Sequence, residues 1–136
     1  MKNILLPILL CSIAVGAKSQ SPEKVIKTWV SGYEKKDWNM ASSQLADDFT
    51  FTSPAGDVRI SLAQFKEKCW PTSEFVNKVE LKKISADGST AFVMYDIHTT
   101  DNKLVHNVEF YTFSNGKIKS IECFFGAGAN YPGSGK

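Results

Sequence analysis

The feature that most constrains this chain is a change in its hydrophobic period near residue 75. Before that point, apolar residues recur every three or four positions, as they do on one face of a helix. After it, apolar and polar residues alternate, and the alternation is interrupted by turn-forming pairs at Asp87-Gly88, Asp101-Asn102 and Asn115-Gly116. Helices followed by consecutive antiparallel strands predict an α+β domain.

Three helices are predicted, each from a residue that can cap its first turn. Ser21-Pro22-Glu23 places a capping hydroxyl before a proline at the first helical position and an acid in the first turn. Asp37 can cap a second helix, and Ser61 with Gln64 has the form of a capping box that opens a third. We expect the third helix to end near Pro71, because a proline disfavours helical geometry in the residue before it.

Strands are expected at residues 49–52, 79–84, 91–99, 104–113 and 118–125, and the long ones carry apolar residues on both faces. One face is expected to hold Val93, Tyr95, Ile97, Val108 and Phe110, and the other to hold Phe92, Met94, Tyr111 and Phe113. The helices can cover one face, whereas the other would be an exposed apolar surface unless a second molecule covers it. We therefore expect a homodimer through the outer face of the sheet.

The first 19 residues have the composition of a secretory signal peptide. Lys2 is followed by an apolar run over residues 4–17, which is too short to span a bilayer and ends in small residues. Cleavage is expected after Ala17 or, as we favour, after Ser19, which would leave Gln20 as the first residue. This segment predicts an exported protein, either periplasmic or secreted.

Removal of the signal peptide leaves a domain at residues 20–126 and a glycine-rich tail at residues 127–136, which we expect to be flexible. The remaining 117 residues hold fourteen basic and fourteen acidic side chains, against sixteen and fourteen in the whole chain. A neutral chain with a single arginine, Arg59, offers no clustered cations for nucleic-acid phosphates, so we expect no nucleic-acid partner. No later apolar run is long enough to cross a membrane.

The spacing of cysteines and histidines gives no sign of a metal site or of a cofactor. The exported chain keeps Cys69 and Cys123, an even pair that can form a disulfide in an oxidising compartment. Both lie among apolar residues, so two buried thiols are the favoured interpretation. His98 and His106 stand eight residues apart without a CxxC or HExxH motif, and there is no glycine-rich phosphate loop. We expect no metal and no cofactor.

Several motifs, in order along the chain, resemble those of SnoaL-like domains. They are YEKKDW at residues 33–38, LADDF at 45–49, SPAG at 53–56, EFYTFSNGKI at 109–118 and FFG at 124–126. SnoaL-like domains belong to the nuclear transport factor 2-like superfamily, which includes ketosteroid isomerase and polyketide cyclases. The resemblance implies the cone fold of that superfamily, also called cystatin-like, in which three helices pack on a curved antiparallel sheet around a pocket.

The resemblance to ketosteroid isomerase can be followed residue by residue. The position similar to its catalytic carboxylate is Ser53, and the position similar to its oxyanion-hole tyrosine is Trp29. Its oxyanion-hole acid corresponds to Glu109, where the carboxyl group is kept. Because a hydroxyl of ordinary acidity cannot abstract the proton that a carboxylate abstracts, we expect no steroid isomerase activity.

The resemblance also implies which side chains face the pocket. On the strands, these are Met94, Asp96, Ile121, Cys123 and Phe125, with His98 at the rim and Asn107 beside Glu109. Elsewhere in the chain, Trp29, Tyr33, Phe51 and Ser53 are further candidates for the ligand-binding surface.

The register of one hairpin decides how the polar candidates meet. If the turn at Asp101-Asn102 has two residues, Asp96 faces Asn107, and Asp96 and Glu109 lie roughly 7–8 Å apart as diagonal neighbours. Two carboxyl groups in an aromatic pocket repel each other, so that one can hold its proton near neutral pH. Glu109, Asp96 and His98 are then the candidate catalytic residues. A register shift of one residue would turn this set outward and bring His106 in.

Three functions remain open. The leading one is an exported protein that binds an unknown small molecule, largely apolar with one polar end, because Ser53 replaces the expected carboxylate. The second is a cofactor-independent isomerase, cyclase or dehydratase, in which Asp96, His98 and Glu109 transfer protons. The third is a structural or interaction domain whose cone is filled by its own side chains.

Overall fold

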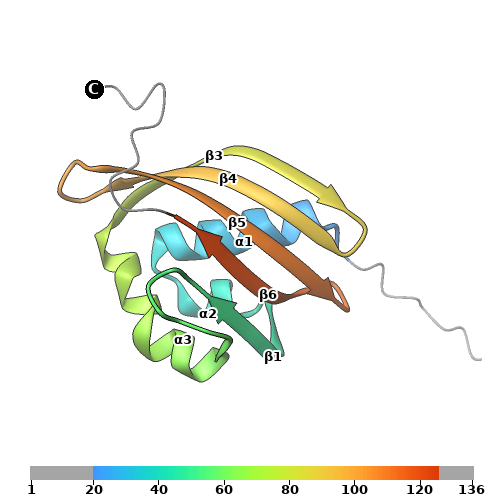
Figure 1. Ribbon diagram of the computed structural model, residues 1–136. Helices are drawn as coiled ribbons and strands as arrows, with labels where there is room; N and C mark the ends of the chain where they lie inside the picture. The colour runs from blue at the N-terminus through green and yellow to red at the C-terminus, as the bar shows by residue number, and fades with distance from the viewer. Residues whose placement is uncertain (1–19, 126–136) are drawn as a thin grey trace, which may run out of the picture.

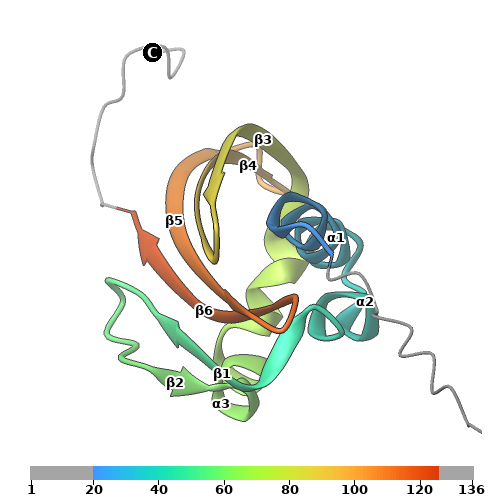
Figure 2. The ribbon, with the colours of Figure 1, turned by 90° about the vertical axis from the view of Figure 1, so that its right-hand side faces the viewer.

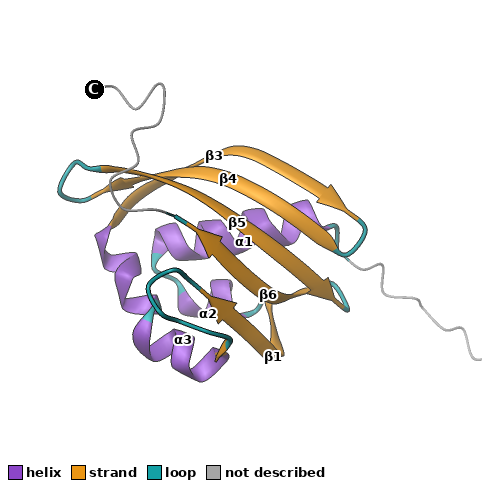
Figure 3. Ribbon diagram, viewed as in Figure 1, coloured by secondary structure: helices purple, strands orange, loops and turns teal. Residues whose placement is uncertain are grey.

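The helices of the computed structural model, which describes residues 20–125, lie on the concave side of one curved sheet (Figure 1; Figure 3). The helical elements are α1 (Pro22–Lys35), α2 (Trp38–Ser42), α3 (Leu62–Lys68) and the 3-10 helix η1 (Trp70–Phe75). The strands are β1 (Leu45–Thr52), β2 (Ile60–Ser61), β3 (Val76–Asp87), β4 (Thr90–Thr99), β5 (Leu104–Ser114) and β6 (Lys117–Phe124). This order confirms the predicted α+β class. The predicted signal peptide (1–19) and tail (127–136) lie outside the described residues.

The predicted capping residues begin the three α-helices. The Asp37 side chain accepts a hydrogen bond from the backbone N–H of Met40 at 2.9 Å, and Ser21 caps α1 in the same way. Ser61 and Gln64 form both hydrogen bonds of a capping box at the start of α3. The chain does not leave helical geometry at Pro71, because proline fits the first turn of the 3-10 helix η1 as well as it fits that of an α-helix.

The strands are ordered β2-β1-β6-β5-β4-β3, and every neighbouring pair is antiparallel except the parallel pair β1 and β6. Figure 2 shows the sheet bending around the helices. The ladder is irregular between Leu81 and Lys83 in β3 and between Thr112 and Phe113 in β5. Such bulges increase local twist and bend the strand, which helps the sheet to form a hollow instead of a flat surface.

The hairpin between β4 and β5 has a different register from the one expected. Asp96 pairs with His106, not with Asn107 as expected, and Asn107 pairs with Tyr95. The predicted two-residue turn is therefore wrong, and the register differs by one residue. The loop has three residues, closed by a 2.9 Å hydrogen bond from the Thr99 N–H to the Lys103 carbonyl. Asn102 makes this loop possible because asparagine tolerates the left-handed backbone that it adopts there, with φ of 61°.

The register decides which side chains each face of the sheet presents. Tyr111 and Phe113 pack inward together with Val93 and Tyr95, and they join a core that includes Trp29 of α1. Each predicted face therefore combined residues of β4 and β5 that lie on opposite sides of the sheet. The convex face carries Phe92, Met94, Val108, Phe110 and Phe124, which the ladder places side by side. No helix within residues 20–125 is long and apolar enough to cross a bilayer.

Candidate functional site

A cavity of about 250 Å³ lies between α1 and the concave face of the sheet. Its walls are mainly aromatic and aliphatic, and they include side chains from both ends of the described chain. Eight of the residues expected at the pocket line this cavity: Trp29, Tyr33, Phe51, Asn107, Glu109, Ile121, Cys123 and Phe125. Their role in binding stays a prediction.

Glu109 forms the polar centre of the cavity wall. The Tyr95 hydroxyl donates to Oε1 at 2.8 Å, and the Cys123 thiol donates to the same oxygen at 2.9 Å. The Tyr111 hydroxyl donates to Oε2 in a short hydrogen bond. Glu109 lies on β5, Tyr95 on the neighbouring β4 and Cys123 directly opposite on β6, so the ladder itself brings these donors to the carboxyl group. Three donors around one carboxyl group are the pattern expected for a carboxylate acceptor.

Burial raises the pKa of the Glu109 carboxyl, because its charged form loses hydration in the core. The donors Cys123, Tyr111 and Tyr95 stabilise the charged form and oppose part of that rise. Burial also raises the pKa of the Tyr95 hydroxyl, and the nearby negative charge of Glu109 adds to the effect. Among the described residues that line the cavity, none is a lysine, arginine or histidine. When Glu109 is ionised, its negative charge therefore has no counter-charge in the cavity wall.

Asn107 provides the second polar group of the cavity. Its amide nitrogen donates to the Tyr95 hydroxyl oxygen at 2.6 Å, whereas its Oδ1, which is buried, has no hydrogen-bond partner. The orientation of the Asn107 amide follows from the number of available protons, because Tyr95 has one hydroxyl proton and donates it to Glu109. The oxygen of Tyr95 can then only accept, so the Asn107 amide must present its nitrogen there. Oδ1 of this lining residue is therefore left without a donor.

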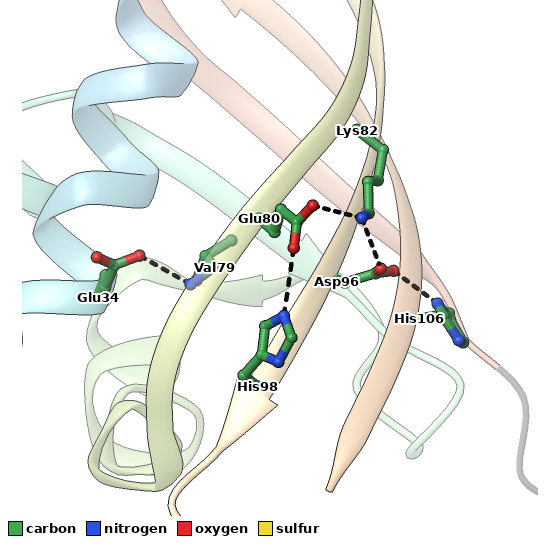
Figure 4. Close-up of polar contacts among 7 residues, drawn as sticks. All are labelled: Glu34, Val79, Glu80, Lys82, Asp96, His98 and His106. Carbon is green, nitrogen blue, oxygen red and sulfur yellow. Dashed lines mark hydrogen bonds and ion pairs between the residues drawn. The ribbon is translucent and has the colours of Figure 1, made fainter. Parts of the chain in front are cut away.

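Asp96 and His98, two of the predicted catalytic residues, lie on the opposite side of the sheet. On the outer face, Asp96 forms an ion pair with Lys82 at 3.2 Å and contacts His106 Nδ1 at 2.6 Å, and His98 lies 3.3 Å from Glu80 (Figure 4). The prediction that Asp96 and His98 point into the pocket is wrong, because the three-residue loop shifts the register by one position.

Met94 is displaced for the same reason. Its side chain is 47% exposed on the convex face, where it pairs with Val108 instead of Glu109. The shift does not affect Asn107 and Glu109, because the expected and observed registers both place these two residues of β5 inward.

Ser53 is buried, but it does not line the cavity. Its hydroxyl donates to Asp57 at 2.7 Å and accepts from the backbone N–H of Ala55 at 3.2 Å, so it stabilises the turn after β1. The prediction that Ser53 contacts a ligand in the pocket is therefore not supported by its position.

Sequence reasoning missed two tyrosines and one cysteine of the cavity wall. Tyr95 and Tyr111 hold the Glu109 carboxyl, and Cys69 lines the cavity from the segment after α3. The hairpin register was the missing signal for Tyr95, because the observed pairing with Asn107 places both on one face.

Cys69 and Cys123, the two cysteines within residues 20–125, are free thiols. Burial raises the pKa of Cys69 to about 11, with a further contribution from the nearby charge of Asp57. Burial raises the pKa of Cys123 as well. No group of three or more metal-ligating side chains occurs within residues 20–125.

The helices, the curved sheet and the cavity between them define a cone fold of the nuclear transport factor 2-like class. A solved structure of a protein from Kribbella flavida DSM 17836 matches with a TM-score of 0.70 and 20% identity, over 77% of this chain and 86% of that one. An NTF2-like protein from Cytophaga hutchinsonii ATCC 33406 matches with a TM-score of 0.64 and 19% identity, over 81% and 94%. TerC, co-crystallised with polyporic acid, matches with a TM-score of 0.64 and 16% identity, over 76% and 90%.

The sequence profile of the SnoaL-like domain matches residues 26–121, which is most of the chain. The protein therefore belongs to the SnoaL-like domain family. A search among curated proteins finds no match.

The raised pKa of Glu109 predicts a specific pH dependence of stability. A carboxyl group whose pKa is higher in the folded state stabilises the fold below its unfolded pKa, near 4.5, and this contribution is lost as the pH rises through the folded value. The free energy of unfolding of the native protein, minus that of Glu109→Gln, should therefore fall as the pH rises from about 4 to 8. Each unit of raised pKa corresponds to about 1.4 kcal/mol.

Urea denaturation of both proteins across this pH range measures the difference. Glu122→Gln, at an exposed position of the neighbouring strand, controls for the amide substitution itself. A difference that stays constant or grows with pH would contradict the account of Glu109.

Proposed function

We propose that this protein binds a small, largely apolar molecule in the cavity, with the polar end of the molecule against Asn107 and Glu109. The observation that carries the proposal is a mainly apolar cavity with a cluster of hydrogen-bonding groups around one carboxyl group. Mainly apolar walls with a few placed polar groups are the usual form of a small-molecule site. TerC, which shares the fold, was crystallised with an organic small molecule.

The size of the cavity limits the ligand. Its volume of about 250 Å³ is slightly below the roughly 300–1,000 Å³ of sites for drug-sized molecules, so a body of one or two rings is the better fit. The rings of Phe51 and Phe65 pack at 4.9 Å and those of Trp29 and Tyr33 at 5.9 Å, which gives the cavity rigid walls.

The alternatives are weaker than binding. Proton transfer between two carboxyl groups needs both in the cavity, but Asp96 lies on the outer face with His106 and Lys82. Proton transfer by Glu109 alone would still need a second group or a water molecule to complete a cycle. A cone filled by its own side chains does not agree with the open volume beside Trp29 and Glu109.

Filling the cavity should abolish binding. Val79 lines the cavity on β3, so Val79→Trp is expected to lower the affinity for single-ring probes at least tenfold. Suitable probes are 2-phenylethylamine, 2-phenylethanol and 3-phenylpropionate, which share one apolar body and differ in the head group. Isothermal titration calorimetry measures the affinities.

Val58→Trp is the matched control, because Val58 is 76% exposed and does not line the cavity. This variant should bind as the native protein does, provided that both variants melt cooperatively. If the native protein binds none of the three probes, the proposed function is contradicted.

We further propose that the convex face contacts a second copy of the chain. Phe92 and Phe110 pack with ring centroids 4.8 Å apart, and the next row of the ladder holds Met94, Val108 and Phe124. Phe92 and Phe124 are each more than half exposed in the single chain. Two adjoining rows of large apolar side chains are a surface that a symmetric dimer would bury.

A charge in these rows should prevent that association. Phe124→Asp is expected to convert a dimer to a monomer in sedimentation velocity runs at micromolar concentration, because burial of an unpaired carboxylate is costly. Val58→Asp places the same charge at an exposed site outside the two rows and should leave the dimer intact. A monomeric native protein at this concentration would refute the dimer.

Export is the third part of the proposal, and the composition of residues 1–19 supports it. The exported protein should begin at Gln20, or at Lys18 if cleavage follows Ala17. N-terminal sequencing of the protein from the exported fraction of its own cells measures this, and a chain that begins at Met1 would contradict it.

A further inference from the structure

The cavity wall holds a carboxyl group and an unpaired amide oxygen, and none of its described residues is cationic, which restricts the ligand more than size does. We infer that the polar end of the ligand is a primary ammonium group, so that the protein takes a small amine with an aromatic or aliphatic body. This inference rests on the proposed function, because it specifies the head group of a molecule bound in the same cavity.

The first step is the unpaired oxygen of Asn107. Asn107 is only 8% exposed, and its Oδ1 has no hydrogen-bond partner in the protein. A buried acceptor without a donor is unfavourable, so a ligand gains affinity by supplying an N–H or O–H group there. A carbonyl or carboxylate oxygen cannot do this, because it has no proton to donate. The ligand must therefore carry a donor.

The second step is the charge of Glu109. Its carboxyl group accepts from Tyr95, Tyr111 and Cys123, and these are neutral donors. An ammonium group adds the positive charge that the cavity wall lacks, which favours a cation over a neutral hydroxyl and disfavours an anion.

The third step is the position of the two acceptors. Asn107 and Glu109 are two residues apart on β5 and share its concave face, roughly 7 Å apart along the backbone. Their side chains meet at one atom, because the Tyr95 hydroxyl contacts both of them. An ammonium group has three N–H donors and can serve both acceptors at once.

The aromatic wall fits the same head group. Trp29, Tyr33 and Phe51 line the cavity together with Glu109, and ring faces attract cations as well as apolar bodies. A small amine would thus place its charge against Glu109 and its body among these rings.

The inference has a pH signature. Protonation of Glu109 removes the charge that attracts an ammonium group, so amine affinity should rise with pH as Glu109 ionises. The titratable groups that face it are Tyr95, Tyr111, Cys123 and, from α1, Tyr33. Burial raises the pKa of Tyr33 to about 12 and raises the pKa of the other three groups above their ordinary values, so these four groups stay neutral near neutral pH.

Isothermal titration calorimetry with 2-phenylethylamine, 2-phenylethanol and 3-phenylpropionate tests the inference at pH 5, 6, 7 and 8. The native protein should bind the amine at least tenfold more tightly than the alcohol at pH 7, and the propionate least tightly of the three. The affinity for the amine should rise across this range, and that for the alcohol should change much less.

Two variants separate charge from structure. Glu109→Gln should remove the preference for the amine, whereas Asp96→Asn makes the same acid-to-amide change on the outer face and should keep it. If Glu109→Gln does not fold, the pH series of the native protein decides the question on its own.

Each outcome has a defined meaning. An alcohol or propionate bound as tightly as the amine would overturn the ammonium inference and leave the proposed binding function standing. An amine preference that persists in Glu109→Gln, or that lacks the rise with pH, would also overturn it. Absence of binding by all three probes would overturn the proposed function together with the inference.

Discussion

The buried carboxyl group of Glu109 is the constraint on which the rest of the site depends. A charged group in the core is tolerated only when donors surround it, and this chain places one donor on each of three adjacent strands. That arrangement requires β4, β5 and β6 to keep their register, so the site and the sheet stabilise each other. It also leaves the cavity wall with a carboxyl group that lacks a counter-charge, an unpaired amide oxygen at Asn107 and a lining of aromatic rings.

The two faces of the sheet separate two sets of ionisable groups. Inside, Glu109 has only neutral partners and its pKa is raised by burial. Outside, the charge of Asp96 is balanced by Lys82, and its carboxylate also contacts His106, so it has partners within the protein. Of these two carboxyl groups, the inner one is left for a ligand to complement. This contrast is the physical reason for proposing binding at Glu109 and a structural role for Asp96.

Much of the fold could be predicted from the sequence because its signals are local. The caps at Ser21, Asp37 and Ser61 each depend on residues three positions away, and the structure contains all three. The site was harder to predict, because its geometry depends on one loop. Asn102 adopts a left-handed backbone that adds a residue to the turn, and the whole of β4 then presents its other face. Glu109 and Asn107 were placed correctly because they lie on β5, whereas Tyr95 was missed because it lies on β4.

The most direct test of the central claim is a carbon-13 NMR titration of the Glu109 carboxyl group, with and without saturating 2-phenylethylamine. The account predicts a pKa above the ordinary glutamate value in the free protein and a decrease when the amine binds, because the ammonium group stabilises the carboxylate. A Glu109 carboxyl that titrates at its ordinary value and does not respond to the amine would contradict the account.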